Sequence, residues 1–299
     1  MGGALVTIFF LMSGFLLYLN NCYVTDKLQF YYKRWKTLFP AFYIGWIVVH
    51  LLVVIKKHSF FYKESVSPWS MLFSAFGIDG YASVHGIEGY YYIGEWFLGV
   101  IIVMYLLYPF LIKLLDKCHL LTIGVIVVVW GCCLLYYPIP SFQSLPACLI
   151  TFVSGILLAK TNCVENKFFQ ILAIIMTPIL YFVKMPYLND SMRFDICVHI
   201  FGFCMFFILY WSASLIRNSK CRFAVSWLSS FTYEVFLIQH LCIVLFQKLF
   251  QPNSDIVSLL LIITIIFVTF ILAWILKKIT NRLLYSCMYI KLESRLNLG

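Results

Sequence analysis

Nine long apolar runs, separated by short polar segments, set the pattern of the chain. A helix that crosses the hydrocarbon core of a bilayer needs about 20 mostly apolar residues, and a helix that is apolar on all sides has no polar face to turn toward water. The pattern therefore predicts an all-α, multi-pass transmembrane helical protein with about nine spans in this chain. The predicted spans are residues 4–20, 37–55, 93–115, 121–137, 142–159, 168–184, 196–216, 230–250 and 256–276.

The composition supports this class. Of the 299 residues, 63% are hydrophobic and 11% are charged, whereas a soluble domain is nearer half apolar and a quarter charged. A disordered chain is excluded as well, because 19% of the residues are aromatic. No Pro- or Ser-rich linker and no repeat of fixed period divides the sequence, so we expect one membrane-embedded domain over residues 1–299.

The net charge of +10 follows from the positions of the basic residues. If residue 1 lies outside, the cytoplasmic segments hold sixteen of the 22 Lys and Arg residues but only four of the 12 Asp and Glu residues. Cytoplasmic loops of membrane proteins collect Lys and Arg, so no nucleic-acid partner is needed to explain the charge. We expect the N-terminus outside and the C-terminus inside. The cytoplasmic segments are then 21–36, 113–120, 160–167, 217–229 and a basic tail, 277–299.

The start of the chain is unusual for this topology. A first span that begins at about residue 4 and starts outside lacks the basic flank of a signal peptide. We therefore expect a helix that precedes it and runs from inside to outside, with Met1 at an internal or misplaced start.

The longest outside loop, 56–92, is rich in aromatic residues and glycine. Its Tyr residues, Asp79 and the neighbouring Trp96 suit stacking on a sugar ring and hydrogen bonding to its hydroxyl groups. The same aromatic side chains also suit a belt at the membrane surface, and both interpretations stay open.

Lys33, Arg34 and Lys36 form the most basic cluster, at the cytoplasmic start of the second span. Guanidinium and ammonium groups bind phosphate, and Arg does so with two parallel contacts. The alternative is ordinary positive-inside flanking, with these side chains on the headgroups of membrane lipid.

Two further sites carry ionisable groups at the ends of apolar runs or within them. Glu95, beside Trp96, lies at the outer edge of a span, where a carboxylate is costly unless it is paired or faces water. Tyr233 and His240 are seven residues apart and share one face of a helix. A histidine within a span can accept a proton, but it can equally be a buried group hydrogen-bonded to a neighbouring helix.

Common catalytic motifs are missing from the sequence. It contains no HExxH, GxSxG, P-loop or GxGxxG pattern. Most of its 11 cysteines fall inside spans or basic loops, without CxxC spacing. We expect them to be small apolar residues and expect no metal site and no disulfide.

Four segments together resemble the membrane acyltransferase-3 family, in the order in which that family carries them. They are VTIFFLMSGFLLYL (6–19), FYYKRWKTLFPAFYI (30–44), GEWFLGVIIVMYLLYPFL (94–111) and SSFTYEVFLIQH (229–240). The resemblance implies a ten-helix bacterial inner-membrane O-acyltransferase. Such proteins move an acyl group, usually acetyl from acetyl-CoA, to a sugar hydroxyl of a capsular, exopolysaccharide or other surface glycan, or of a lipid-linked sugar. Acetyl-CoA would be a co-substrate, and no bound cofactor is implied.

The resemblance also implies roles for particular residues. Arg34 falls on the basic position that meets the CoA phosphates, with Lys33 and Lys36 beside it. The family's first helix carries the histidine held to be essential for transfer, and this chain starts after that helix. His240 and Glu95 are then the candidates for supporting roles. From their aromatic and polar chemistry, and not from the resemblance, we expect Asp79, Trp96 and Tyr233 to bind the acceptor.

The sequence departs from the family pattern at two positions. The second arginine of the basic motif falls on Thr37, and the frequent glutamate of the third motif falls on Ile101. Two other interpretations of the chain stay open: a transporter or flippase for a lipid-linked sugar, and an inactive remnant of an acyltransferase. No pair of matching repeats, which transporters commonly show, is visible.

Overall fold

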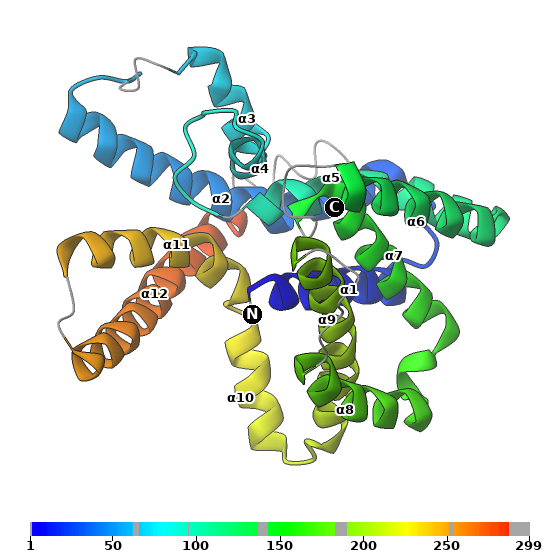
Figure 1. The fold of residues 1–299 in the computed structure, drawn as a ribbon. Helices are drawn as coiled ribbons and strands as arrows, with labels where there is room; N and C mark the ends of the chain where they lie inside the picture. The colour runs from blue at the N-terminus through cyan, green and yellow to red at the C-terminus, as the bar shows by residue number, and fades with distance from the viewer. Residues whose placement is uncertain are drawn as a thin grey trace. The chain divides into compact units, whose positions relative to one another are not determined.

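In the computed structural model, the regular secondary structure of the described residues is all helical, with no β-strand among them. The described residues are 2–61, 66–94, 96–136, 143–182, 190–250 and 254–286. The longer helices are α1 (Gly2–Asn20), α2 (Lys27–Lys57), α5 (Trp96–Lys117), α6 (His119–Tyr136), α7 (Leu145–Thr161), α8 (Lys167–Phe182), α9 (Asp190–Leu215), α10 (Ser219–Ser229), α11 (Thr232–Leu249) and α12 (Asp255–Leu284) (Figure 1). Short helical turns are η1 (Pro68–Ser70), α3 (Met71–Ala75), α4 (Asp79–Val84) and η3 (Cys163–Glu165).

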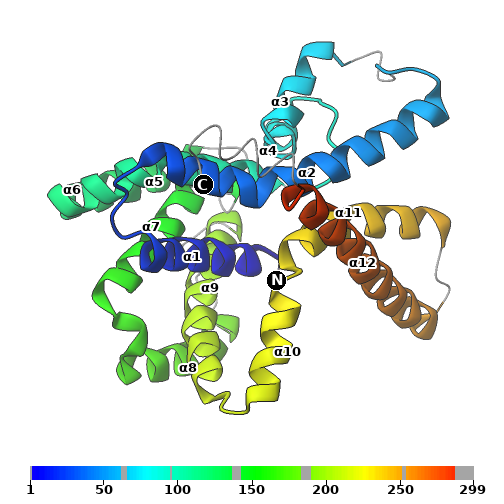
Figure 2. The same ribbon diagram turned by 180° about the vertical axis from the view of Figure 1, so that it is seen from behind.

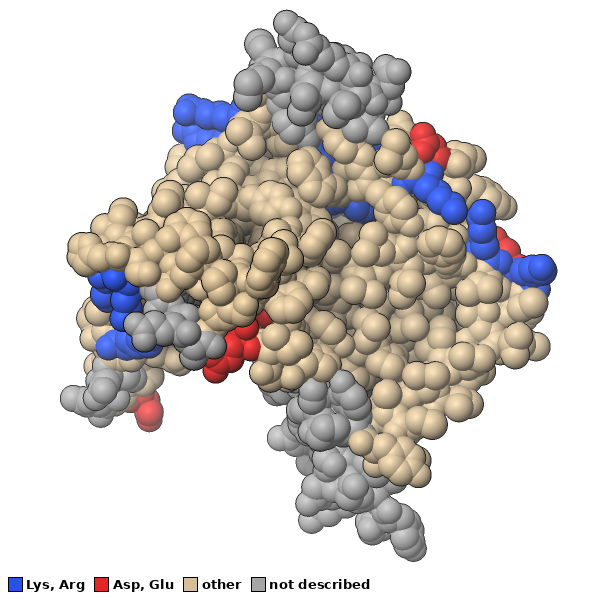
Figure 3. Space-filling view, turned by 90° about the horizontal axis from the view of Figure 1, so that it is seen from above, with Lys and Arg blue, Asp and Glu red and all other residues tan. Residues whose placement is uncertain are grey.

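Each of the nine predicted spans overlaps one of the longer helices. Among the described residues, six helices are long and apolar enough to cross a membrane: α1, α2, α5, α6, α9 and α12. The pair α10 and α11, bent by 53° at the break between them, makes a seventh, and α7 and α8 are shorter apolar helices. Charged side chains are sparse on the surface seen in Figure 3. The all-α, multi-pass membrane class is confirmed.

Two segments that we predicted as cytoplasmic loops are helical. The 21–36 segment becomes helix at Lys27, because the Asp26 carboxylate caps α2 by accepting a hydrogen bond from the Gln29 backbone N–H at 3.1 Å. The 217–229 segment forms α10. Apolar content does not determine the first residue of α2 or of α10. Hydropathy therefore did not predict helix in either segment.

The chain divides into two compact units, Met1–Thr25 with Val103–Ser219, and Asp26–Ile102 with Lys220–Gly299. In the first unit α1 packs against α7 and α9, and α8 packs against α9 (Figure 1 and Figure 2). Glycine makes the α1–α7 approach possible: a Cβ atom on Gly14 would lie 2.0 Å from the Phe152 carbonyl oxygen, and one on Gly155 would lie 2.1 Å from that of Leu11. Small residues at such contacts let membrane helices pack backbone against backbone.

The second unit contains α2, α11, α12 and the loop between α2 and α5. Both α2 and α11 contact α12, and α11 and α12 diverge from one end toward the loop between them (Figure 1 and Figure 2). The buried side of α12 repeats at helical spacing, with Thr269, Ala273, Leu276 and Thr280 all less than one-tenth exposed. This unit carries every described residue that the sequence predicted for the site.

Candidate active site

An irregular segment, residues 89–94, joins α2 and α11 within the second unit. The Gly94 N–H donates to the Leu237 carbonyl on α11 at 3.0 Å, and the Trp46 indole N–H of α2 donates to the Tyr90 carbonyl at 3.0 Å. Gly94 has a φ of +79°, which favours glycine. Both helices lie in predicted spans, where non-helical backbone is tolerated only when it is buried in protein or lines a cavity.

His50 of α2 lies against this segment. Its Nδ1 is 2.8 Å from the Tyr92 hydroxyl oxygen, and its ring stacks on Trp46 with centroids 4.8 Å apart. The side chain is only 3% exposed. Its Nε2 is buried and has no hydrogen-bond partner among the described residues. One ring nitrogen therefore contacts Tyr92, and the other is left without a partner there.

His240 of α11 lies against the same segment from another helix. Its ring stacks on Tyr91 with centroids 6.3 Å apart and an interplanar angle of 27°. The Tyr91 hydroxyl donates to the Gly94 carbonyl at 2.8 Å, which holds the ring in place. His240 is half-buried, so it is more accessible than His50. The structure thus brings two histidines from different helices to one run of three tyrosines, residues 90–92.

Trp96 begins α5 directly after this segment and is half-buried. The next residue, Phe97, packs on Phe236 of α11 with ring centroids 4.0 Å apart. The start of α5 is therefore attached to the helix that carries His240. Glu95, the other predicted residue here, lies outside the described residues.

Tyr233 of α11 contacts α2 near the basic cluster. Its hydroxyl donates to the Leu38 carbonyl of α2 at 2.8 Å. Leu38 is one helical turn from Arg34, whereas Tyr233 is separated from His240 by about 10 Å along α11 at the usual rise per residue. Beside it, Glu234 is buried, and its Oε2 has no hydrogen-bond partner among the described residues.

The basic cluster occupies the first turns of α2 rather than a loop. Lys33 is exposed, and Arg34 and Lys36 are half-buried. The Arg34 guanidinium lies 5.5 Å from the centre of the Phe30 ring, a cation–π contact that orients it. Pro40 has no N–H to give to the Lys36 carbonyl, so this first part of α2 lacks one helical hydrogen bond.

Asp79 is buried inside the long loop, with 2% of its surface exposed. The Ser74 hydroxyl donates to its Oδ2 at 2.9 Å, and the Gly80 N–H donates to its Oδ1 at 3.0 Å. Burial raises the pKa of the carboxyl group to about 6, and these two hydrogen bonds act in the opposite direction. Both oxygens accept hydrogen bonds within the loop, and the Ser74 hydroxyl oxygen also lies 3.4 Å from the Tyr90 carbonyl oxygen of the segment 89–94.

The raised pKa predicts a pH dependence of stability that Asp79→Asn removes. Because the folded state holds the proton more tightly than the unfolded chain, whose pKa is near 3.8, stability falls as the pH rises from about 4 through 6. A shift of about two units corresponds to about 3 kcal/mol. Melting temperatures of the purified protein at pH 4 and pH 7.5 measure most of this change. The variant should lose most of this difference, and an unchanged difference would refute the assignment to Asp79.

Sequence reasoning missed His50 as a member of this site. The sequence places it near the outer end of a span, and no role was predicted for it. The available signal was a titratable group in an apolar run, four residues after Trp46 and so on the same face of the helix. The partner, Tyr92, lies 42 residues further along the chain, and no local pattern reveals that pairing.

Comparison with known proteins identifies the family to which the chain belongs. The helices define a multi-pass membrane protein, and the described residues place histidine, tyrosine and basic side chains on its second unit. A family model described as an acyltransferase domain matches residues 1–278. The chain therefore belongs to the acyltransferase-3 family, as the four sequence segments suggested, and the family supports an acyltransferase. No curated protein and no solved structure matches the chain.

Proposed function

We propose that the protein is a bacterial inner-membrane O-acyltransferase that moves an acyl group, in the first place acetyl, from acyl-CoA to a sugar hydroxyl of a surface glycan or of a lipid-linked sugar. The observation that carries the proposal is the basic start of α2 in a chain of the acyltransferase family. The orientation that we propose, with the N-terminus outside and the C-terminus in the cytoplasm, exposes this basic helix end to the compartment that supplies acyl-CoA.

The donor side uses Arg34, with Lys33 and Lys36. CoA carries several phosphate charges, and Arg binds phosphate through two parallel hydrogen bonds while Lys contributes a point charge. Two of the three cations are half-buried, where their attraction for phosphate is less screened by water than at a free surface. The resulting site holds the donor at one end of α2.

The acceptor side uses the segment 89–94 with Trp96 and His240. Aromatic rings stack on the apolar face of a sugar, and the half-buried His240 can hydrogen-bond its hydroxyl group. In the reaction, the hydroxyl oxygen attacks the thioester carbonyl, its proton goes to a base, and the C–S bond breaks to release CoA as the thiol. Holding both reactants in one geometry accounts for much of the acceleration in such transfers.

The donor assignment predicts a change in KM on replacement of Arg34. Membranes that contain the full-length protein are supplied with radiolabelled acetyl-CoA, and label in glycan is counted. Arg34→Ala should raise the KM for acetyl-CoA about tenfold or more, because a charge-assisted hydrogen bond contributes about 1.5–3 kcal/mol, and should change kcat little. Lys113→Ala, at an exposed position on α5, is the matched control. An unchanged KM in Arg34→Ala, or no transfer by the unaltered protein, would overturn the proposal.

A further inference from the structure

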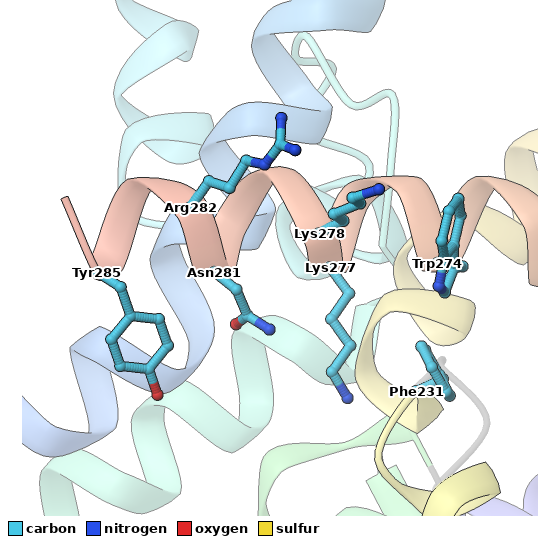
Figure 4. A pocket seen from close by; sticks show the side chains of 7 residues that line it. All are labelled: Phe231, Trp274, Lys277, Lys278, Asn281, Arg282 and Tyr285. Atoms are coloured by element: carbon cyan, nitrogen blue, oxygen red, sulfur yellow. The ribbon is translucent and has the colours of Figure 1, made fainter.

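A cavity of about 430 Å³ lies at the end of α12, on the second unit (Figure 4). Its volume falls in the range of about 300–1,000 Å³ that is usual for small-molecule sites. Phe231, just before α11, lines one side, and Trp274 with the polar residues that follow it on α12 lines the other. None of the basic residues assigned to the donor above contributes to it.

Among the described residues, Lys277, Lys278 and Arg282 line this cavity and no carboxylate does. Lys277 is held in place: its ammonium group donates to the Ser230 carbonyl and lies 4.3 Å from the centre of the Phe231 ring. The Lys278 ammonium lies 4.9 Å from the centre of the Trp274 ring. Lys278 and Arg282 are exposed and project to the same side of α12 (Figure 4).

A second cavity, of about 180 Å³, adjoins the first and is lined entirely by apolar and aromatic side chains. The two share Phe231 and Trp274, and the second continues along α12 to Phe267, Phe270 and Ile271. Together they form one groove, which we call the α12 groove, with a cationic end and an apolar end. The apolar end lies nearer the middle of the α12 span, and the cationic end lies at its last turns.

We propose that the α12 groove binds an anionic phospholipid, with the headgroup phosphate on Lys278 and Arg282 and an acyl chain against Phe267 and Trp274. Charge complementarity requires an anion at one end, and the apolar continuation requires a chain attached to it. The place suits a membrane lipid, because α12 is the most apolar of the candidate spans and only 11% of its most apolar window is buried in protein. Basic pockets at the ends of spans bind acidic lipid headgroups.

Lys277 attaches this end of α12 to the break between α10 and α11. Its ammonium group joins α12 to Ser230, at the break where α10 and α11 bend by 53°. The buried residue Glu234 follows this break, in the first turn of α11.

Native mass spectrometry of the purified protein in detergent tests this proposal by counting bound lipid. The probes are dioleoyl phosphatidylglycerol, dioleoyl phosphatidylcholine, short-chain dihexanoyl phosphatidylglycerol and coenzyme A. The unaltered protein should bind dioleoyl phosphatidylglycerol at least tenfold more tightly than phosphatidylcholine. Lys278→Ala with Arg282→Ala should weaken this binding roughly 20- to 30-fold, since each cation near a lipid surface contributes about 1 kcal/mol.

Two controls show whether weaker lipid binding comes from loss of charge in the α12 groove, from loss of positive charge anywhere on the protein, or from misfolding. Lys113→Ala with Lys117→Ala removes the same charge from exposed positions on α5 and should bind lipid as the unaltered protein does. Lys278→Arg with Arg282→Lys keeps both charges and should retain binding. Equal binding by the double alanine variant would overturn the proposal. So would dihexanoyl phosphatidylglycerol binding as tightly as the dioleoyl lipid, or displacement of bound lipid by coenzyme A, which would make the groove a nucleotide site.

Discussion

Replacing Gly14 by alanine is expected to destabilise the protein by about 3 kcal/mol or more and to lower its melting temperature by roughly 5–10 °C. The added Cβ would lie 2.0 Å from the Phe152 carbonyl oxygen, which is backbone and has no rotamer with which to move away. The α1 and α7 helices must therefore separate. Thermal unfolding of the purified protein in detergent, with size-exclusion chromatography to follow aggregation, measures the effect.

The same exchange at Gly124 is the matched control, because that glycine is also helical and a Cβ there would meet nothing within 4 Å. Gly124→Ala should be neutral or slightly stabilising, since alanine favours a helix by about 1 kcal/mol over glycine. Gly155→Ala should repeat the loss seen at Gly14, as its Cβ would lie 2.1 Å from the Leu11 carbonyl oxygen. Equal melting temperatures for the Gly14 and Gly124 variants would contradict this account of the α1–α7 contact.

Replacing His240 by alanine should lower acyl transfer by roughly 10- to 100-fold, the loss expected when a reactant is no longer held in place. His240 stacks on Tyr91 and is half-buried, so it is the histidine of this group that an acceptor can reach. The KM for acetyl-CoA should stay within about twofold, because Arg34 is one helical turn from the Leu38–Tyr233 contact and Tyr233 is a further distance of about 10 Å along α11 from His240. Transfer of label to glycan measures both quantities.

His240→Gln separates a positioning role from proton transfer. Its side-chain amide can donate a hydrogen bond to the acceptor but cannot take a proton near neutral pH. We expect this variant to keep most of the activity that the alanine variant loses, with an unchanged pH profile. If the glutamine variant is as inactive as the alanine variant and the profile loses a limb, His240 accepts the proton itself. Full activity in His240→Ala would remove the residue from the site.

The spans were predictable because an apolar run long enough to cross a bilayer has few alternatives. The start of α2 was not, since it depends on the hydrogen bond from the Gln29 N–H to Asp26 and not on apolar content. Pro40 looked like the first turn of a helix, yet it lies inside α2. The α10 helix was missed for a related reason, because its eleven residues are too polar to register as a span.

The candidate site was predictable only in part. Residue types indicated Arg34 and His240, because cations and titratable groups are rare in apolar surroundings. The contacts that group them join distant parts of the chain, as with His50 and Tyr92 or Tyr233 and Leu38. Asp79 is predicted as an acceptor ligand, and the sequence does not reveal that its oxygens accept hydrogen bonds from Ser74 and Gly80 inside the loop. Such pairings depend on tertiary structure, which periodicity and composition do not encode.

Side-specific transfer in sealed membrane vesicles tests the central claim most directly, namely that acyl-CoA reaches the basic start of α2 from the cytoplasmic side and gives its acyl group to a glycan. Labelled acetyl-CoA is added outside vesicles of either orientation, and it does not cross an intact bilayer. We predict that inverted vesicles transfer label to glycan and that right-side-out vesicles do so only after permeabilisation. Transfer by intact right-side-out vesicles, or no transfer in either orientation, would contradict the account.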